Sequence, residues 1–206
     1  MTGVQTCALP ICDGGSPTNA ILFSPQDSVS DGAGNLYIAD TLHNRIRKVT
    51  NGVITTIAGT GQAGFGGDGG PAASALLYNP AGLALDAAGN LFVSDTSNNV
   101  IRKIAGGVIT TVVGTPTGGS FADNVAATGA ALNLPKGIAM DSGGNLYIAD
   151  SGTQRVRKVS NGQITTIAGI GGAAGYNGDG GQATAAALNN PSDVKLDASE
   201  IGRAHV

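Results

Sequence analysis

The stretch GNLYIAD at residues 34–40 decides the fold, because it recurs as GNLFVSD at 89–95 and again as GNLYIAD at 144–150. Its closing aspartate returns every 55 residues, since 95 − 40 and 150 − 95 both equal 55. Self-similarity at a fixed period is the signature of a repeat architecture. The flanking sequence keeps the same register, with the related stretches NRIRKV (44–49), NVIRKI (99–104) and QRVRKV (154–159) downstream and PQDSVSD (25–31), PAGLALD (80–86), PKGIAMD (135–141) and PSDVKLD (191–197) upstream.

Each repeat is expected to contain four short β-strands. The glycine of Ala87-Ala88-Gly89 can take the positive φ of a bulged hairpin, and Asn51-Gly52 and Asn161-Gly162 are strong signals for tight hairpins. Four antiparallel strands per repeat make one small sheet. In the second repeat the predicted strands are 82–86, 91–95, 100–105 and 108–113.

The faces of these strands indicate how the sheets assemble. VITTIA at 53–58 is apolar or threonine on both faces, whereas a sheet with one wet face would alternate apolar with strongly polar residues. Radial stacking of sheets buries both faces. The small residues Gly82, Ala84, Gly137 and Ala139 suit an innermost strand, where sheets crowd near an axis. The sequence therefore predicts an all-β fold, a β-propeller of four-stranded antiparallel blades in which three full blades and partial ones form an open arc.

The repeat region is predicted to span 13–199, and the two ends of the chain differ from it. GVQTCALPI at 3–11 and EIGRAHV at 200–206 look like translated sequencing adapters, so residues 1–12 and 200–206 are interpreted as non-native tails. The remaining blades of the same parent chain are then expected as the neighbours of this arc. The predicted blades are 25–59, 80–114 and 135–169, with the start of a fourth at 191.

Composition excludes several classes of partner. The 34 glycines alternate with Val, Ile, Leu and Tyr runs, which is typical of turns between strands. A net charge of −3 and a pI of 5.1 argue against nucleic acid and anionic membranes, and four Tyr and four Phe are few for base stacking. No apolar run approaches the roughly 18 residues of a membrane span. Neither nucleic-acid binding nor membrane insertion is expected.

The repeated stretches carry a family resemblance. GNLYIADTLHNRIRKV (34–49) and its two partners resemble NHL repeats, whose pattern places Asn-Leu-Tyr-Val-Ala-Asp before an Asn-x-Arg-Ile stretch. The linker GDGGPAASALLYNPAGLALD (67–86) is similar to that of long bacterial NHL-repeat proteins. The resemblance implies a propeller, often six-bladed in this family, and an extracytoplasmic or secreted location. Because the fold hosts protein binding, RNA binding and a few enzymes, it does not give the function by itself.

Asp40, Asp95 and Asp150 each end the second strand of a repeat. A ring of carboxylates could bind a metal or a cationic ligand, but a residue that recurs in every blade favours a structural role. In that role each aspartate accepts hydrogen bonds from backbone N–H groups of the following turn. Adjacent Arg-Lys pairs on the third strand point to opposite faces, so one member of each pair is expected to cross to a neighbouring blade or to snorkel along it. The pairs are Arg47/Lys48, Arg102/Lys103 and Arg157/Lys158.

Other candidate residues favour structure over chemistry. Asp68 and Asp179 lie in GDGG motifs, where one carboxylate per loop is few for calcium and a turn closed by the aspartate is favoured. His43 is the one histidine of the repeat region, while zinc needs three or four ligands. No G-x-S-x-G, P-loop or HExxH motif occurs. No catalytic, cofactor-binding or metal-binding residue is therefore predicted, and no cofactor.

The sequence favours a non-catalytic scaffold for protein or glycan binding within a larger bacterial surface or secreted protein. The alternative is a propeller hydrolase or lyase whose active site lies largely in other blades. Recognition is expected in the loops after the second and fourth strands, because the repeats differ there. These are loops 41–45, 96–100 and 151–155, with the candidate residues Asn44, Arg45, Asn99, Gln154 and Arg155, and linkers 60–79, 115–134 and 170–190.

Overall fold

The computed structural model describes residues 13–172, 174–197 and 202–205 of the chain. Its strands form three complete antiparallel sheets and one partial sheet. The first sheet contains β1 (Ser28–Ser30), β2 (Leu36–Asp40), β3 (Arg45–Thr50) and β4 (Val53–Ala58). The second contains β5 (Pro80–Leu85), β6 (Leu91–Asp95), β7 (Val100–Ala105) and β8 (Val108–Val113). The third contains β10 (Pro135–Met140), β11 (Leu146–Asp150), β12 (Arg155–Ser160) and β13 (Gln163–Ala168), and the partial sheet pairs β14 (Asp193–Leu196) with β15 (Gly202–His205).

Helical structure in the described residues is limited to single 3-10 turns. One kind of turn joins the second and third strands of each sheet, and the other kind lies before the first strand. The first kind comprises η2 (Thr41–His43), η4 (Thr96–Asn98) and η6 (Ser151–Thr153). The second comprises η1 (Pro17–Asn19), η3 (Ala72–Ser74), η5 (Ala127–Gly129) and η7 (Ala183–Ala185).

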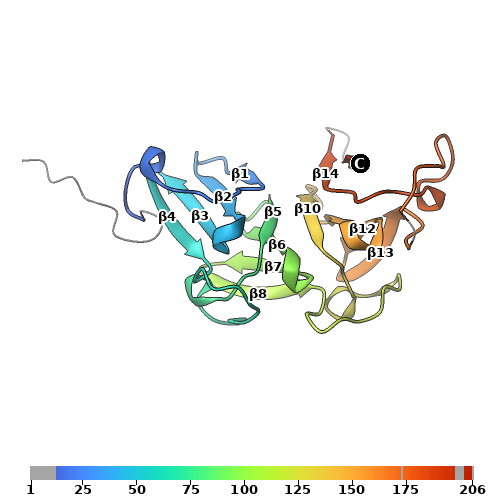
Figure 1. Ribbon diagram of the computed structural model, residues 1–206, viewed down its shortest axis with the longest axis horizontal. Coiled ribbons are helices and arrows are strands. Elements are labelled where there is room, and N and C mark those ends of the chain that lie inside the picture. The colour runs from blue at the N-terminus through green and yellow to red at the C-terminus, as the bar shows by residue number, and fades with distance from the viewer. Residues whose placement is uncertain (1–12, 173, 198–201, 206) are drawn as a thin grey trace, which may run out of the picture.

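The sheets stand side by side along an arc (Figure 1). Strands β1, β5, β10 and β14 line the concave side, and β4, β8 and β13 lie on the outer side. The predicted propeller of four-stranded antiparallel blades is confirmed, and Asn51, Gly52 and Gly89 take the positive φ that their hairpins require. The tail predicted at 1–12 lies outside the described residues, and of the tail predicted at 200–206 only β15 is described.

A fifth, linker-derived strand was not expected from the sequence. In the third sheet β9 (Val125–Ala126) pairs with the outer strand β13. Single bridges do the same in the other sheets, joining Gly15 to Ile54 of β4 and Pro71 to Val108 of β8. Each linker thus covers the outer strand of the sheet that follows it. An uncovered outer strand would offer free backbone groups to other chains, so this pairing removes a site of edge-to-edge association.

The core lies between successive sheets. The second strand of each sheet sends alternate side chains to the two sides: Leu91 and Val93 pack toward the first sheet, and Phe92 packs toward the third. The inner strands approach closely because of Gly82, where a methyl group would overlap the carbonyl oxygen of Lys136. This contact confirms the expected crowding of small residues near the axis.

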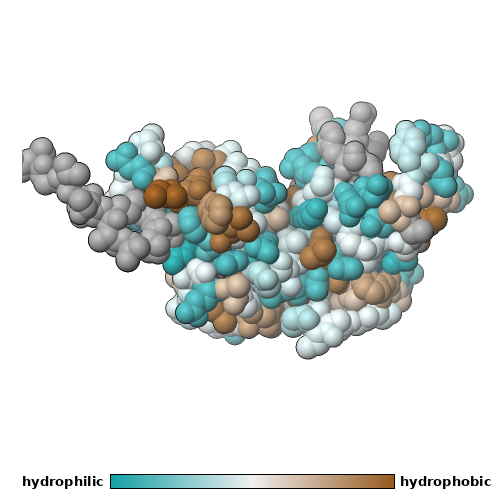
Figure 2. Space-filling view, in the orientation of Figure 1, coloured by the Kyte–Doolittle hydropathy of each residue, from teal (hydrophilic) through white to brown (hydrophobic). Residues whose placement is uncertain are grey.

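The first sheet has one apolar face without a neighbouring sheet. Leu36 is 36% exposed, whereas the equivalent Leu91 and Leu146 are 2% and 3% exposed. Apolar side chains of the preceding linker lie exposed nearby, among them Ile21 and Phe23. Figure 2 shows this region as the brown surface over the first sheet. A face that is buried in two repeats and open in the third has the composition of an interface.

Candidate functional site

The buried charges of each repeat form an Asp–Arg–Asp unit. An arginine from the third strand, 0% exposed, lies between the aspartate that ends the second strand and an aspartate of the preceding linker. In the second sheet Arg102 Nη1 lies 3.2 Å from Asp95 Oδ2, and Nη2 lies 2.7 Å from Asp68 Oδ1. The other units are Asp13–Arg47–Asp40 and Asp123–Arg157–Asp150.

This unit corrects two expectations. Asp95 does not cap the turn that follows it; its carboxylate accepts from the backbone N–H of Tyr78, 17 residues earlier, at 2.7 Å and from the Asn98 side chain at 2.9 Å. Asp68 closes no turn of its own but binds the arginine of the next sheet. Local sequence could not reveal the Tyr78 N–H as a partner of Asp95 or Arg102 as a partner of Asp68, because these groups lie 17 and 34 residues away.

Asp40 and Asp150 repeat the arrangement of Asp95, and Asp179 differs from Asp68. Asp40 accepts from the N–H of Phe23 at 2.8 Å, and Asp150 accepts from that of Asn133 at 2.7 Å. Asp179 accepts from the Tyr176 hydroxyl at 3.4 Å. The turns that follow Asp40 and Asp150 are present, but the prediction that these carboxylates accept from backbone N–H groups of those turns is wrong, as it is for Asp95.

In each Arg-Lys pair the arginine and the lysine lie on opposite faces of the sheet and make different contacts. The arginines turn into the Asp–Arg–Asp units rather than crossing to a neighbouring blade. The lysines lie along aromatic rings of their own sheet, with Lys103 Nζ 5.3 Å from the ring centre of Phe92. Lys103 also lies 3.6 Å from Asp86. The two members of each pair thus lie on opposite faces as expected, but the printed contacts of the lysines are with their own sheet and not with a neighbouring blade.

Burial sets the proton affinity of the inner aspartates. Loss of solvent raises the pKa of Asp95 from its ordinary 3.8 to about 6, although Asn98, the Tyr78 N–H and Arg102 all oppose the rise. Burial raises the pKa of Asp150 in the same way. Because the folded state then holds the proton more tightly than the unfolded chain, the stability that this proton confers is lost as pH rises toward 6. These carboxylates are poor candidates for a freely accessible cation site.

Three loop candidates connect successive sheets. Asn44, Asn99 and Gln154 have left-handed φ values of 53°, 59° and 60°. The side-chain oxygen of each accepts a hydrogen bond from a backbone N–H about 35 residues later, as Asn99 does from Leu134 at 2.8 Å. Asn44 accepts from Asn79 at 2.9 Å, and Gln154 accepts from Asn190. These residues therefore bind neighbouring segments of the chain and are not free recognition groups.

The two arginine candidates lie beside them and hold linkers. Arg45 Nη2 donates to the carbonyl of Thr60 at 2.6 Å, and Arg155 Nη1 donates to that of Phe121 at 3.4 Å. Both guanidinium groups are partly exposed. The predicted recognition loops thus contribute mainly contacts within the chain.

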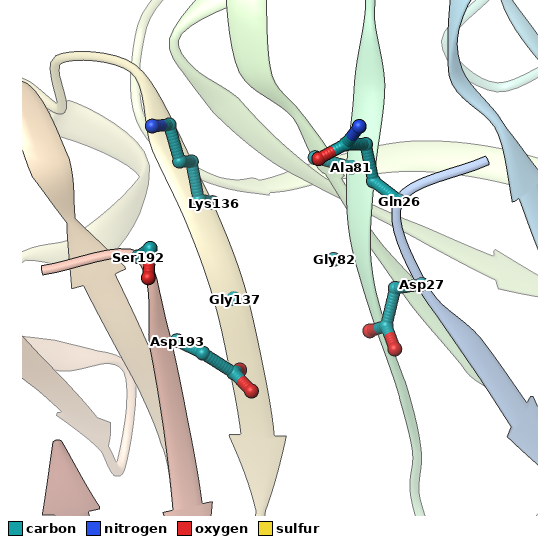
Figure 3. A pocket seen from close by; sticks show the side chains of 8 residues that line it. All are labelled: Gln26, Asp27, Ala81, Gly82, Lys136, Gly137, Ser192 and Asp193. Carbon is teal, nitrogen blue, oxygen red and sulfur yellow. The ribbon is translucent and has the colours of Figure 1, made fainter. Parts of the chain in front are cut away.

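One pocket of the described residues lies where the inner strands begin. It has a volume of about 270 Å³ and draws two residues from each of the four repeats (Figure 3). In each repeat these two residues follow the proline before the first strand, and they differ between repeats although the surrounding sequence is shared. The lining residues are Gln26, Asp27, Ala81, Gly82, Lys136, Gly137, Ser192 and Asp193.

Sequence reasoning missed this site, although a signal was present. The position after the proline reads Gln26, Ala81, Lys136 and Ser192, so it changes character in every repeat. A position that varies inside an otherwise constant repeat is one that the shared fold does not dictate. Only the arc brings the four copies together.

The described residues contain neither a cluster of metal-ligating side chains nor a membrane-spanning helix. Within 13–172, 174–197 and 202–205, no three His, Cys, Asp or Glu side chains gather as a metal ion would require. His43 Nδ1 lies 2.9 Å from Asp40 Oδ2, and its ring is 25% exposed. Among the described helical turns, none has the length and apolarity to cross a membrane.

Comparison with known proteins identifies the repeat. The family model for the teneurin NHL domain matches residues 61–121, and that for the NHL repeat matches residues 132–159. Two stretches of the chain therefore match NHL-type repeat models. A curated relative, the chloroplastic protein SUPPRESSOR OF QUENCHING 1 of Arabidopsis thaliana, is 40% identical over 93 residues, which is 44% of this chain and 8% of that protein.

Solved structures share the propeller fold with this chain at low identity. An auxiliary nutrient binding protein of Bacteroides ovatus matches with a TM-score of 0.63 and 17% identity, over 92% of this chain and 51% of its own. A gluconolactonase of Xanthomonas campestris matches with a TM-score of 0.56 and 18% identity, over 92% of this chain and 55% of its own. The chain thus spans about half the length of these structures and a small part of the curated relative. At this identity the likeness shows the fold, which serves binding proteins and enzymes alike.

Proposed function

We propose that the chain is a non-catalytic scaffold that binds a protein or glycan ligand, within a larger extracytoplasmic or secreted bacterial protein. One observation carries the proposal: the pocket at the start of the inner strands gathers polar side chains at positions that differ between repeats. The buried Asp–Arg–Asp units and the loop residues such as Asn99 are occupied with contacts inside the chain. Concave sites with a few placed polar groups are the usual form of a ligand site.

The test is a binding screen with a matched pair of variants. The 206-residue chain, tethered at low density, is exposed to an array of glycans and to purified candidate proteins. A ligand of the pocket should bind the unmodified chain and lose binding in Gln26→Ala/Ser192→Ala, whose side chains line the pocket. The control Gln163→Ala changes an exposed residue of the outer strand β13 and should bind normally. Equal loss in the control, or conversion of the bound ligand to product, would contradict the proposal.

A hydrolase or lyase is the second candidate, favoured by the contact between His43 and Asp40. A buried carboxylate that orients a partly exposed imidazole resembles the base of a general acid–base site. In the other sheets Asn98 and Thr153, at the position of His43, donate to the equivalent aspartates Asp95 and Asp150, which supports a structural role for His43. His43→Asn should therefore leave ligand binding unchanged. If the unmodified chain turns over its ligand and His43→Asn abolishes turnover, the enzyme hypothesis replaces the scaffold.

A further inference from the structure

Lys136 is the one cation among the eight residues that line the pocket. It is half-buried at the start of β10, and no carboxylate of the described residues lies within 4.0 Å of its ammonium group in an ion pair. The other repeats place Gln26, Ala81 and Ser192 at this position. A half-buried lysine without an internal partner is available to an external anion.

The backbone of Lys136 is held firmly. Its carbonyl oxygen accepts a hydrogen bond from the Ser94 hydroxyl at 2.5 Å, and Gly82 packs directly against it. Ser94 lies on β6 of the second sheet, so the contact fixes the third sheet to the second. The side chain therefore extends from a rigid strand, which limits the conformational cost of holding a ligand there.

The two carboxylates of the pocket are already oriented. Asp27 accepts from the N–H groups of Ser28 and Leu83, both at 2.8 Å. Asp193 accepts from the N–H of Val194 at 2.8 Å through Oδ1, and its Oδ2 lies 3.2 Å from Nζ of Lys195, whose side chain is 56% exposed. A carboxylate has about four lone-pair sites, so each can still accept from hydroxyl groups of a ligand. Figure 3 shows Asp27 and Asp193 at one end of the pocket and the Lys136 ammonium, with the Gln26 amide, at the other end.

The separation of the cationic end of the pocket from its acidic end indicates which class of ligand it can bind. The lining contains no aromatic or large aliphatic side chain, and Ala81 is its largest purely apolar group. A peptide ligand would find no apolar subsite for its side chains there. A sugar ring with one carboxylate offers an anion for the cationic end and hydroxyl donors for the acidic end, and a volume of about 270 Å³ is of the size of a small-molecule site.

We infer that the pocket binds a uronic acid residue of an acidic glycan, with its carboxylate on Lys136 and Gln26 and its hydroxyl groups on Asp27 and Asp193. The inference rests on the proposed binding function and names its ligand class. No bond of the ligand is made or broken in this role.

The probe is a trigalacturonate, compared with its fully methyl-esterified form, which keeps the hydroxyl groups and removes the charge. Affinities are measured by surface plasmon resonance on the tethered 206-residue chain at low and high salt. The test variant is Lys136→Gln. The control Lys48→Gln removes the same charge from β3, where Lys48 lies over the Tyr37 ring outside the pocket.

The unmodified chain and Lys48→Gln should bind trigalacturonate more tightly than its methyl ester, and added salt should lower the affinity for trigalacturonate. Lys136→Gln should bind the acid about tenfold more weakly or worse, as expected for loss of a charge-assisted hydrogen bond. Equal binding of acid and ester, or an acid affinity unchanged in Lys136→Gln, would overturn the inference while leaving a glycan-binding function in place. Binding of an acidic peptide but of neither sugar would overturn the inference and retain the protein-binding form of the function. Binding of no probe, glycan or protein, would overturn both.

Discussion

Replacement of Arg102 by methionine tests the Asp–Arg–Asp unit most directly. Arg102 is 0% exposed and joins Asp95, also 0% exposed, to Asp68, which is 39% exposed. Its guanidinium lies 4.9 Å from the ring centre of Phe65, so methionine can fill much of the same space. The main effect of Arg102→Met is thus electrostatic, because the carboxylate of Asp95 stays buried without its cation.

The expected loss can be worked from the groups left behind. Removing one partner of a buried ion pair costs about 3–5 kcal/mol. Asp68 can rehydrate at little cost, and Asp95 keeps two donors, from Tyr78 and Asn98. The loss should therefore lie near the lower limit, about 3 kcal/mol at pH 7. It should shrink at pH 5, because a carboxyl whose pKa is already about 6 can take up a proton.

The assay is urea denaturation followed by far-ultraviolet circular dichroism. The matched control is Lys103→Met, the adjacent residue on β7, whose side chain is 30% exposed and pairs with Asp86 at 3.6 Å. That surface pair should contribute at most about 1 kcal/mol. In the double variant Arg102→Met/Asp95→Asn, the buried charge is gone and most of the lost stability should return. Equal effects of the two single variants, or no recovery in the double variant, would refute the assignment of the unit as a buried structural pair.

The other predictions concern pH, packing and association. In the unmodified chain the free energy of unfolding should fall by up to about 3 kcal/mol through Asp95 as pH rises from below 4 to above 6, since the rise of its pKa from 3.8 to about 6 is roughly two units of about 1.4 kcal/mol each. Asp95→Asn should lose this decline, and an unaltered pH profile of stability would contradict the buried titration. Gly82→Ala should destabilise by about 1–3 kcal/mol because its methyl group meets a neighbouring backbone, whereas Gly32→Ala, which meets open space, should change little in the same denaturation assay. Leu36→Lys should reduce self-association measured by light scattering, because this residue lies on the open apolar face. Val108→Lys, of similar exposure on another sheet, should not, and equal effects would show that the first sheet has no special role.

The sequence by itself determined the repeat, the four strands of each sheet and the turns between them. Periodic features such as Asp40, Asp95 and Asp150 at intervals of 55 residues, and positive-φ positions such as Gly89, are encoded within a few neighbouring residues. Two apolar strand faces sufficed to predict stacking, because each face must be covered. The small residue Gly82 on the inner strand likewise indicated that neighbouring strands approach each other closely there, as its contact with Lys136 shows.

Only the tertiary structure decided which groups meet. The partners of Asp95 lie 17 residues earlier and seven residues later, and Asp68 meets an arginine 34 residues away. The pocket gathers Lys136 with residues up to 110 positions away, since 136 − 26 = 110. No local pattern fixes such pairings, because they depend on the angle and spacing at which one sheet packs on the next. Local sequence therefore determines the strands and turns of each blade. The way the blades stack determines which charged groups are buried together and where the candidate binding site forms.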